Sequence, residues 1–136
     1  MKKIVAFLMA VVFFCSVFSF VIQAESVSLY NNHTMRTSTS FTISDDGLAE
    51  VYTSYAAYED VMTEAVITLT IKKRILLLFW DEITTFTISS TETLFNHTFQ
   101  RRLSETGTYK CEVEYVVYGT AGEADVIPFE DLVTYS

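Results

Sequence analysis

Cysteine is scarce in this chain, which has two among its 136 residues, and that scarcity excludes a disulfide framework. Cys15 lies inside an N-terminal apolar run, and Phe14 precedes it where a lipoprotein signal needs a small residue. Cys111 is then the only thiol in the rest of the chain, so no intramolecular disulfide can form. We expect Cys111 to be a buried small hydrophobe, with a reactive or intermolecular thiol as the alternative.

Residues that carry enzyme chemistry are also sparse. No nucleophile elbow, phosphate loop, zinc spacing or calcium loop occurs, and the two histidines, His33 and His97, are far apart in the sequence. The acidic pairs at 45–46 and 59–60 are typical of turns, with weak calcium binding as the alternative reading. The sequence therefore predicts a protein that is not an enzyme, with no catalytic residues, no cofactor and no bound metal.

Positive charge is scarce as well, because nine Lys and Arg face 17 Asp and Glu for a net charge of -8. Lys2 and Lys3 belong to the N-terminal leader described next, and without them the net charge becomes -10. So acidic a surface repels nucleic acid and anionic lipid headgroups. We expect no nucleic-acid partner, and membrane contact through the leader if it stays uncleaved.

What the chain does have begins with residues 1–24. Two lysines after Met1 are followed by an apolar run over residues 4–22 and then by Gln23 and Ala24. A positive start, an apolar centre and a small residue at the end predict a helical secretory signal peptide. We expect residues 25–136 to form one secreted, extracellular domain. The alternative is an uncleaved leader that anchors the domain outside a membrane, because the run is nearly long enough to span a bilayer.

The rest of the chain has one proline, four glycines and many Thr, Val, Ile, Tyr and Phe residues, which is the composition of β-strands. Alternation of apolar and polar residues predicts seven short strands. They lie at residues 41–44, 48–57, 65–72, 80–88, 93–101, 108–118 and 123–127. Residues 65–72 alternate best and are expected to be central. Pro128 is expected to end an edge strand, with residues 129–136 a tail or a short extra edge.

Residues 105–111 read Glu-Thr-Gly-Thr-Tyr-Lys-Cys and resemble the start of strand F in immunoglobulin domains. In that family the tyrosine packs inward and its hydroxyl bonds the backbone of the preceding turn. The resemblance implies this tyrosine corner at Tyr109. It does not extend to the family's disulfide or its buried tryptophan, since Leu69 stands where that tryptophan would be. We expect an all-β, immunoglobulin-like antiparallel β-sandwich of about seven strands.

A second resemblance covers nearly the whole chain after the leader. It rests on residues 44–49, 65–73, 80–86, 107–113 and 119–123. In these stretches the chain is similar to a group of small secreted β-sandwich proteins of Gram-positive, mostly gut-dwelling (Firmicutes-type) bacteria. The resemblance implies export and a β-sandwich, and it implies no activity.

Residues 75–80 depart from that group, because they read Ile-Leu-Leu-Leu-Phe-Trp where the group has a polar linker. Side chains alternate on a strand, so about half of these six need a cover outside the core. A neighbouring loop or tail is the first expectation, and a partner protein, self-association or a membrane surface are the alternatives. The candidate interaction surface is Leu76, Leu78 and Trp80 with the basic Lys72 and Arg74.

Aromatic residues suggest a second candidate site. Tyr52 and Tyr58 have the same parity on the second strand and its end, and with Trp80 they could stack on sugar rings as a glycan platform; ordinary cross-strand packing is the alternative. We therefore predict a secreted, non-enzymatic binding module whose partner is an unknown protein or glycan at a cell surface. A carbohydrate-binding module is the alternative function.

Overall fold

The computed structural model describes residues 31–136, so the expected leader at 1–24 lies outside the described part. The described part contains seven strands and no helix. The strands are β1 (Thr34–Ile43), β2 (Leu48–Ala57), β3 (Met62–Leu76), β4 (Phe79–Ser90), β5 (Leu94–Arg102), β6 (Gly107–Gly119) and β7 (Asp125–Tyr135). The prediction of an all-β chain with about seven strands is confirmed for these residues.

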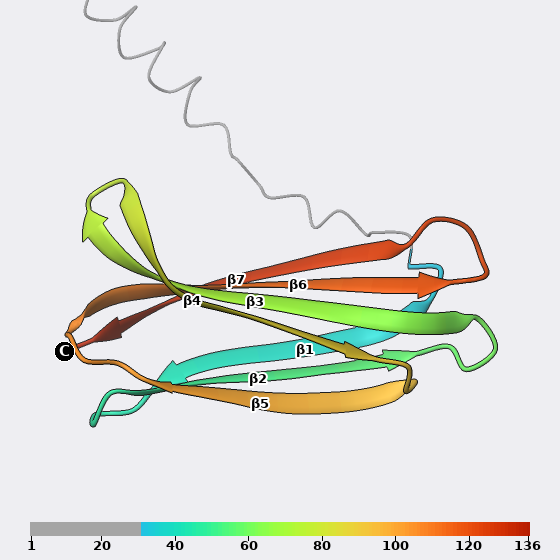
Figure 1. Ribbon diagram of the computed structural model, residues 1–136, viewed down its shortest axis with the longest axis horizontal. Helices are drawn as coiled ribbons and strands as arrows, with labels where there is room; N and C mark the ends of the chain where they lie inside the picture. Colours follow the sequence, from blue (N-terminus) through green and yellow to red (C-terminus); the bar gives the residue numbers. More distant parts are fainter. Residues whose placement is uncertain (1–30) are drawn as a thin grey trace, which may run out of the picture.

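The strands form two antiparallel sheets in the order β1-β2-β5 and β4-β3-β6-β7. Figure 1 shows the two sheets as separate layers. β1 of the first sheet also contacts β7 of the second. The arrangement is that of a β-sandwich. β3 lies between β4 and β6, which confirms the expectation that this strand is central.

The core lies between the layers and follows the period of two that strands impose. Each of the three most buried strands points alternate side chains inward. They are Ala49, Val51, Thr53 and Tyr55 of β2, Ala65, Ile67, Leu69 and Ile71 of β3, and Tyr109, Cys111, Val113, Tyr115 and Val117 of β6. Among the residues that the structure describes, the core cluster runs from Phe41 to Tyr135, so the sandwich has a hydrophobic core built from its own strands.

The turn between β1 and β2 forms where the sequence predicts it. Gly47 has a φ of 83°, a conformation that glycine adopts readily, and its N–H donates to the carbonyl oxygen of Ser44 at 2.9 Å. β1 starts at Thr34, earlier than the predicted start at residue 41. The prediction missed residues 34–40 because they are mostly Ser and Thr and show little apolar alternation. Strand structure there comes from pairing with β2.

β7 differs from the prediction at its end. It continues through Pro128 to Tyr135, so residues 129–136 are neither a tail nor a separate edge. β7 pairs with β6 alone, and an edge strand tolerates a proline because the missing N–H is not needed by a second neighbour. Past the proline, Phe129 and Val133 still pack against the core.

β4 contains a register shift that explains its irregular sequence. Thr84 lies opposite Ile71 and Glu82 opposite Lys72, which leaves Ile83 as an extra residue on β4. An extra residue of this kind is a β-bulge and reverses which face the following side chains occupy. Ile83 and Phe86 therefore do not share a strict parity, although both are partly buried.

Candidate functional site: the β3–β4 hairpin tip

The β3–β4 hairpin extends beyond the rest of its sheet. β3 pairs with β6 only as far as Lys73, which lies opposite Tyr109, while its pairing with β4 continues to Leu76 opposite Phe79. Residues 77–78 form the turn between the two strands. The end of the hairpin is therefore a two-stranded ribbon with no third strand beside it. In Figure 1 it projects away from the two layers.

The hairpin tip, defined here as residues 75–79, is apolar throughout and exposed throughout. Leu77 and Leu78 are 88% and 85% exposed, more than any other large apolar side chain in residues 31–136. Intramolecular cover was the first expectation for this segment, and no part of the chain that the structure describes provides it. Burying one such side chain is worth about 1.5–3 kcal/mol, so the tip leaves a substantial hydrophobic gain unused.

Directly below the tip, two cations lie over the ring of Trp80. The guanidinium carbon of Arg74 is 5.0 Å from the ring centroid, and Nζ of Lys110 is 4.6 Å from it. Cations attract the negative face of an aromatic ring at such distances. Arg74 lies opposite Trp80 on the hairpin, whereas Lys110 comes from β6. We call these three residues the Trp80 belt.

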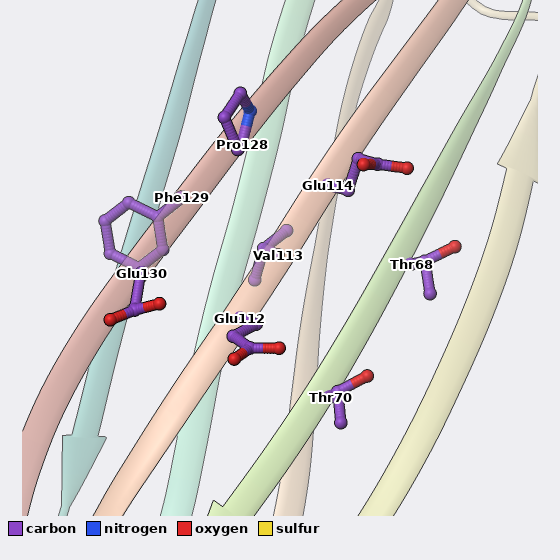
Figure 2. Close-up of a pocket in the computed structure, with 8 residues that line it drawn as sticks. All are labelled: Thr68, Thr70, Glu112, Val113, Glu114, Pro128, Phe129 and Glu130. Carbon is purple, nitrogen blue, oxygen red and sulfur yellow. The ribbon is translucent and has the colours of Figure 1, made fainter.

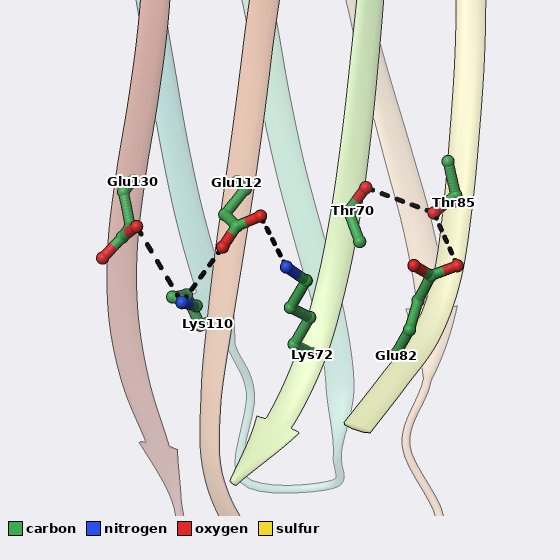
Figure 3. Close-up of polar contacts among 7 residues, drawn as sticks. All are labelled: Thr70, Lys72, Glu82, Thr85, Lys110, Glu112 and Glu130. Carbon is green, nitrogen blue, oxygen red and sulfur yellow. Dashed lines mark hydrogen bonds and ion pairs between the residues drawn. The ribbon is translucent and has the colours of Figure 1, made fainter. Parts of the chain in front are cut away.

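Below the Trp80 belt, ion pairs cross the outer face of the four-stranded sheet (Figure 3). Nζ of Lys72 is 2.8 Å from Oε2 of Glu112, and Nζ of Lys110 is 3.0 Å from the other oxygen of that carboxylate and 4.0 Å from Glu130. The hydrogen bond between Lys72 and Glu112 raises the pKa of the lysine and lowers the pKa of the glutamate. The positive charges of these lysines are therefore balanced by carboxylates, so the lysines do not form a free basic patch.

The five residues of the expected interaction surface lie together, in different roles. Leu76 and Leu78 belong to the exposed tip, Trp80 and Arg74 to the belt, and Lys72 to the ion-pair network. Arg74 has no carboxylate partner within residues 31–136.

Lys110 is the member of this site that the sequence did not reveal. Alternation on its strand shows that it faces away from the core. The sequence does not show which residue of another strand it meets.

The three residues of the expected glycan platform are not gathered in one place. Tyr52 is 37% exposed on the outer face of the three-stranded sheet, and Tyr58, 46% exposed, follows the end of the same strand. Six residues of strand place them about 20 Å apart. Trp80 belongs to the other sheet and lies under the hairpin tip. What remains of a platform is Tyr52 by itself among polar neighbours.

A shallow concavity of about 530 Å³ lies on the outer face of the four-stranded sheet (Figure 2). Its rim carries three carboxylates and two hydroxyls, and Pro128 borders it. The carboxylates are Glu112, Glu114 and Glu130, and the hydroxyls belong to Thr68 and Thr70. Glu112 and Glu130 are engaged by lysine, so the concavity is an acidic, mostly satisfied surface.

Cys111 and His97 are packing residues. Cys111 is fully buried, as expected, and burial raises the pKa of its thiol to about 12, which makes the reactive-thiol alternative untenable in the folded chain. The ring of His97 stacks on Phe86 with their centroids 5.5 Å apart.

His33 forms part of a second, buried feature at the other end of the sandwich. Its Nδ1 is 3.6 Å from Oδ1 of Asp125, and the Asp125 carboxylate accepts the backbone N–H groups of Asn32, His33 and Thr34 at 2.8, 2.8 and 2.7 Å. Burial by itself would raise the pKa of Asp125, but these hydrogen bonds outweigh it and lower the pKa. We call this feature the Asp125 clamp. It fastens the start of β1 to β7.

Within residues 31–136, no three His, Cys, Asp or Glu side chains are placed to hold a metal ion. The same residues contain no helix long and apolar enough to cross a membrane. No protein family, curated protein or solved structure matches the chain. The hairpin tip with the Trp80 belt is therefore the candidate site on physical grounds alone.

Proposed function

We propose that this chain is a secreted, non-enzymatic binding module with an immunoglobulin-like β-sandwich, and that it contacts its partner through the hairpin tip. The observation that carries this proposal is the exposure of five consecutive apolar side chains, residues 75–79. An apolar patch that a protein leaves in water at a cost to its solubility usually marks an interaction site.

Two observations support the immunoglobulin-like part of the proposal. The sheets β1-β2-β5 and β4-β3-β6-β7 have the order A-B-E and C′-C-F-G in the lettering of immunoglobulin-type sandwiches. The hydroxyl of Tyr109 donates to the backbone carbonyl oxygen of Glu105 at 2.6 Å, which is the bond of a tyrosine corner, and Tyr109 lies on β6, the strand in position F.

Export of the module is proposed from residues 1–24, with a cleaved leader as the main form and an N-terminally anchored domain as the alternative. Two measurements decide between them. The mass of the mature protein, purified from culture medium, should correspond to a chain that starts at Glu25. Recovery of the chain in the membrane fraction with its leader intact would select the anchored form instead.

The contact role of the tip is tested by binding of the chain from Glu25 to intact bacterial and host cells, which present proteins, glycans and lipids together. Leu78→Asp places a charge at the tip, and Leu94→Asp makes the same change at another exposed leucine, 70% exposed on β5. We expect Leu78→Asp to abolish cell binding and Leu94→Asp to retain it. Equal binding by both variants and the wild type would overturn the proposal.

Self-association through the tip is measured separately, by sedimentation velocity over a range of protein concentrations. If a second copy covers the tip, the wild type sediments as a dimer or larger species and Leu78→Asp as a monomer. A monomeric wild type that still binds cells leaves a different partner as the occupant of the tip.

A carbohydrate-binding module remains a second candidate because of one observation. Tyr52 stands exposed among polar side chains, with Ser40 and Thr98 opposite it on the neighbouring strands. Two residues along each strand, on the same face, the amide of Gln100 donates to the carboxylate of Glu50 at 2.7 Å. An aromatic ring bordered by hydroxyls, an amide and a carboxylate suits a sugar. Binding on a glycan array that Tyr52→Ala removes and Tyr58→Ala retains would favour this function, and no binding would end it.

A further inference from the structure

The shape of the hairpin tip restricts what can cover it. The side chains of residues 75–79 come from two strands and the turn that joins them, at the end of a ribbon with no third strand. Strand side chains leave a ribbon on both of its faces. A flat protein surface would cover one face and leave the other in water. Fluid hydrocarbon closes around a projecting end from every side.

The residues are arranged in layers along the ribbon. The five apolar residues of the tip come first, and Trp80 with Arg74 lies next. The ion pairs of Lys72 and Lys110 follow, with Lys110 also reaching the ring of Trp80. Tryptophan rings favour the boundary between hydrocarbon and headgroups, and Arg and Lys place apolar stems in that boundary with their charges toward water. The same order of chemistry is found across one leaflet of a bilayer, from the acyl chains outward.

The depth of the apolar layer suits a shallow insertion. From the turn at residues 77–78 to Trp80 is two to three residues, or about 7–10 Å of strand. Segments that lie in the interface bury their apolar side about 5–10 Å deep. A longer apolar ribbon would carry unpaired edge N–H and C=O groups deeper into hydrocarbon, where they are costly. In this ribbon the charged residues Arg74 and Asp81 mark the end of the apolar layer before that depth is reached.

The charges around the tip select the kind of lipid. Arg74, which has no carboxylate partner in the described residues, lies over the ring of Trp80, while Asp81 and Glu82 follow Trp80 directly in the sequence. The chain without its leader carries a net charge of -10, from the -8 of the whole chain less Lys2 and Lys3. An anionic bilayer repels such a protein, whereas a zwitterionic headgroup offers a phosphate to Arg74 without a net negative surface.

From this shape, layering and charge we infer that the hairpin tip inserts into a lipid bilayer with zwitterionic headgroups. The lipid contact depends on the proposed function, because it takes the tip as the contact surface and specifies what the tip contacts. Residues 75–79 enter the acyl-chain boundary, Trp80 lies at the headgroup level, and the acidic body stays in water.

The first test is flotation of the chain from Glu25 with vesicles of phosphatidylcholine. Removing residues 1–24 ensures that the apolar run at 4–22 adds no lipid affinity of its own. We expect the wild type and Leu94→Asp to float with the vesicles, and Leu78→Asp to partition about tenfold more weakly because a carboxylate resists entry into hydrocarbon. Adding anionic phosphatidylglycerol should weaken binding. Equal flotation of the two variants, or none by the wild type, would overturn the lipid contact.

The second test uses the single tryptophan of the chain, which is Trp80. Its fluorescence reports on the belt alone. With phosphatidylcholine vesicles we expect emission to shift to shorter wavelength and brominated lipids to quench it, for the wild type and Leu94→Asp but not for Leu78→Asp. Vesicle binding with unchanged, unquenched Trp80 emission would place the contact elsewhere on the molecule and overturn the inference.

The two proposals fail in different ways. Cell binding that depends on Leu78, together with no vesicle binding, would overturn the lipid contact and keep the tip as a surface for a protein partner. Cell binding that does not depend on Leu78 would overturn the proposed function itself. Circular dichroism of each variant shows whether it retains the β-sheet fold, so that a loss of binding is assigned to the surface.

Discussion

The two ends of β3 contrast in how the chain treats its polar and apolar groups. At the Met62 end, backbone groups are bonded across the gaps between strands, as when the N–H of Thr120 donates to the carbonyl oxygen of Val61 at 2.9 Å and that of Tyr58 to His33 at 2.9 Å. The Asp125 clamp lies at this end. At the Leu76 end the ribbon leaves its neighbours, and apolar side chains are exposed.

This contrast separates residues that stabilise the fold from residues that are exposed on its surface. Buried polar groups that lose their partners cost a protein stability, so the Asp125 clamp serves folding. Exposed apolar groups contribute little to folding, so the side chains of the hairpin tip are available for the contact proposed above. Substitutions at the first end should change the free energy of unfolding and spare binding. Substitutions at the second end should do the reverse.

The largest effect is expected from Asp125→Ala. The change leaves the N–H groups of Asn32, His33 and Thr34 without an acceptor, two of them buried. A buried unsatisfied donor costs about 1–3 kcal/mol, so we expect the free energy of unfolding to fall by about 4 kcal/mol. Urea unfolding followed by circular dichroism measures it. Asp125→Asn keeps one acceptor oxygen and should lose about half as much; equal stability of Asp125→Ala and the wild type would show that the clamp has no structural role.

Gly119→Ala tests the packing at the same end and should have the next largest effect. A Cβ at this position would overlap Cδ2 of His33 and the backbone oxygen of Val61. Backbone cannot move aside cheaply, and overpacking of a closed site costs about 1–3 kcal/mol, so we expect a loss near the upper limit. Gly122→Ala, which meets only Asn32 at 3.3 Å but has a positive φ, is a partial control. A melting temperature of Gly119→Ala that is equal to or higher than that of Gly122→Ala would contradict the close packing around His33.

A smaller effect is expected from acid, through the carboxylate of the clamp. The pKa of Asp125 lies below its ordinary value of 3.8, because hydrogen bonds from the backbone outweigh the opposing effect of burial. A lowered pKa in the folded state stabilises the fold above the pKa of the unfolded chain, and that stability is lost as the pH falls through the folded value. Unfolding of the wild type should therefore become easier below about pH 4. Asp125→Asn should lack this part of the acid dependence. If its free energy of unfolding changed with pH just as that of the wild type does, Asp125 would be excluded as the source of the acid dependence.

The interior of the strands was predictable, because alternation along a strand reports burial directly. Ile67 and Leu69 point inward for the reason that the sequence shows, and residues 45–47 form the turn that their composition indicates. The beginning of β1 was not predictable, since residues 34–40 are held by pairing and not by apolar alternation. The prediction that a strand ends at Pro128 is wrong, because β7 continues to Tyr135. The sequence does not show on which side an edge strand lacks a neighbour, and so whether the N–H that proline lacks is needed there.

The candidate site was predictable in part for a similar reason. An apolar run such as residues 75–79 is visible in any sequence, but its exposure depends on where β6 stops pairing with β3. Lys110 and Asp125 act on residues 30 and 92 positions away, Trp80 and His33, and only the register of the strands brings them together. Contacts between distant strands are the part of a β-sandwich that local patterns do not encode.

The smallest effect on stability is expected at the hairpin tip. Leu78 is 85% exposed, so replacing it by Asp removes almost no buried surface, and surface substitutions usually change stability by less than about 0.5 kcal/mol. Leu94→Asp, at a leucine that is 70% exposed, should be equally mild. Urea unfolding of both variants should match the wild type, while only Leu78→Asp loses binding. A loss of more than about 1 kcal/mol in Leu78→Asp would show that the tip packs on the fold. The contrast between the two ends of β3 would then be lost, because the apolar end would also be part of what holds the sandwich together.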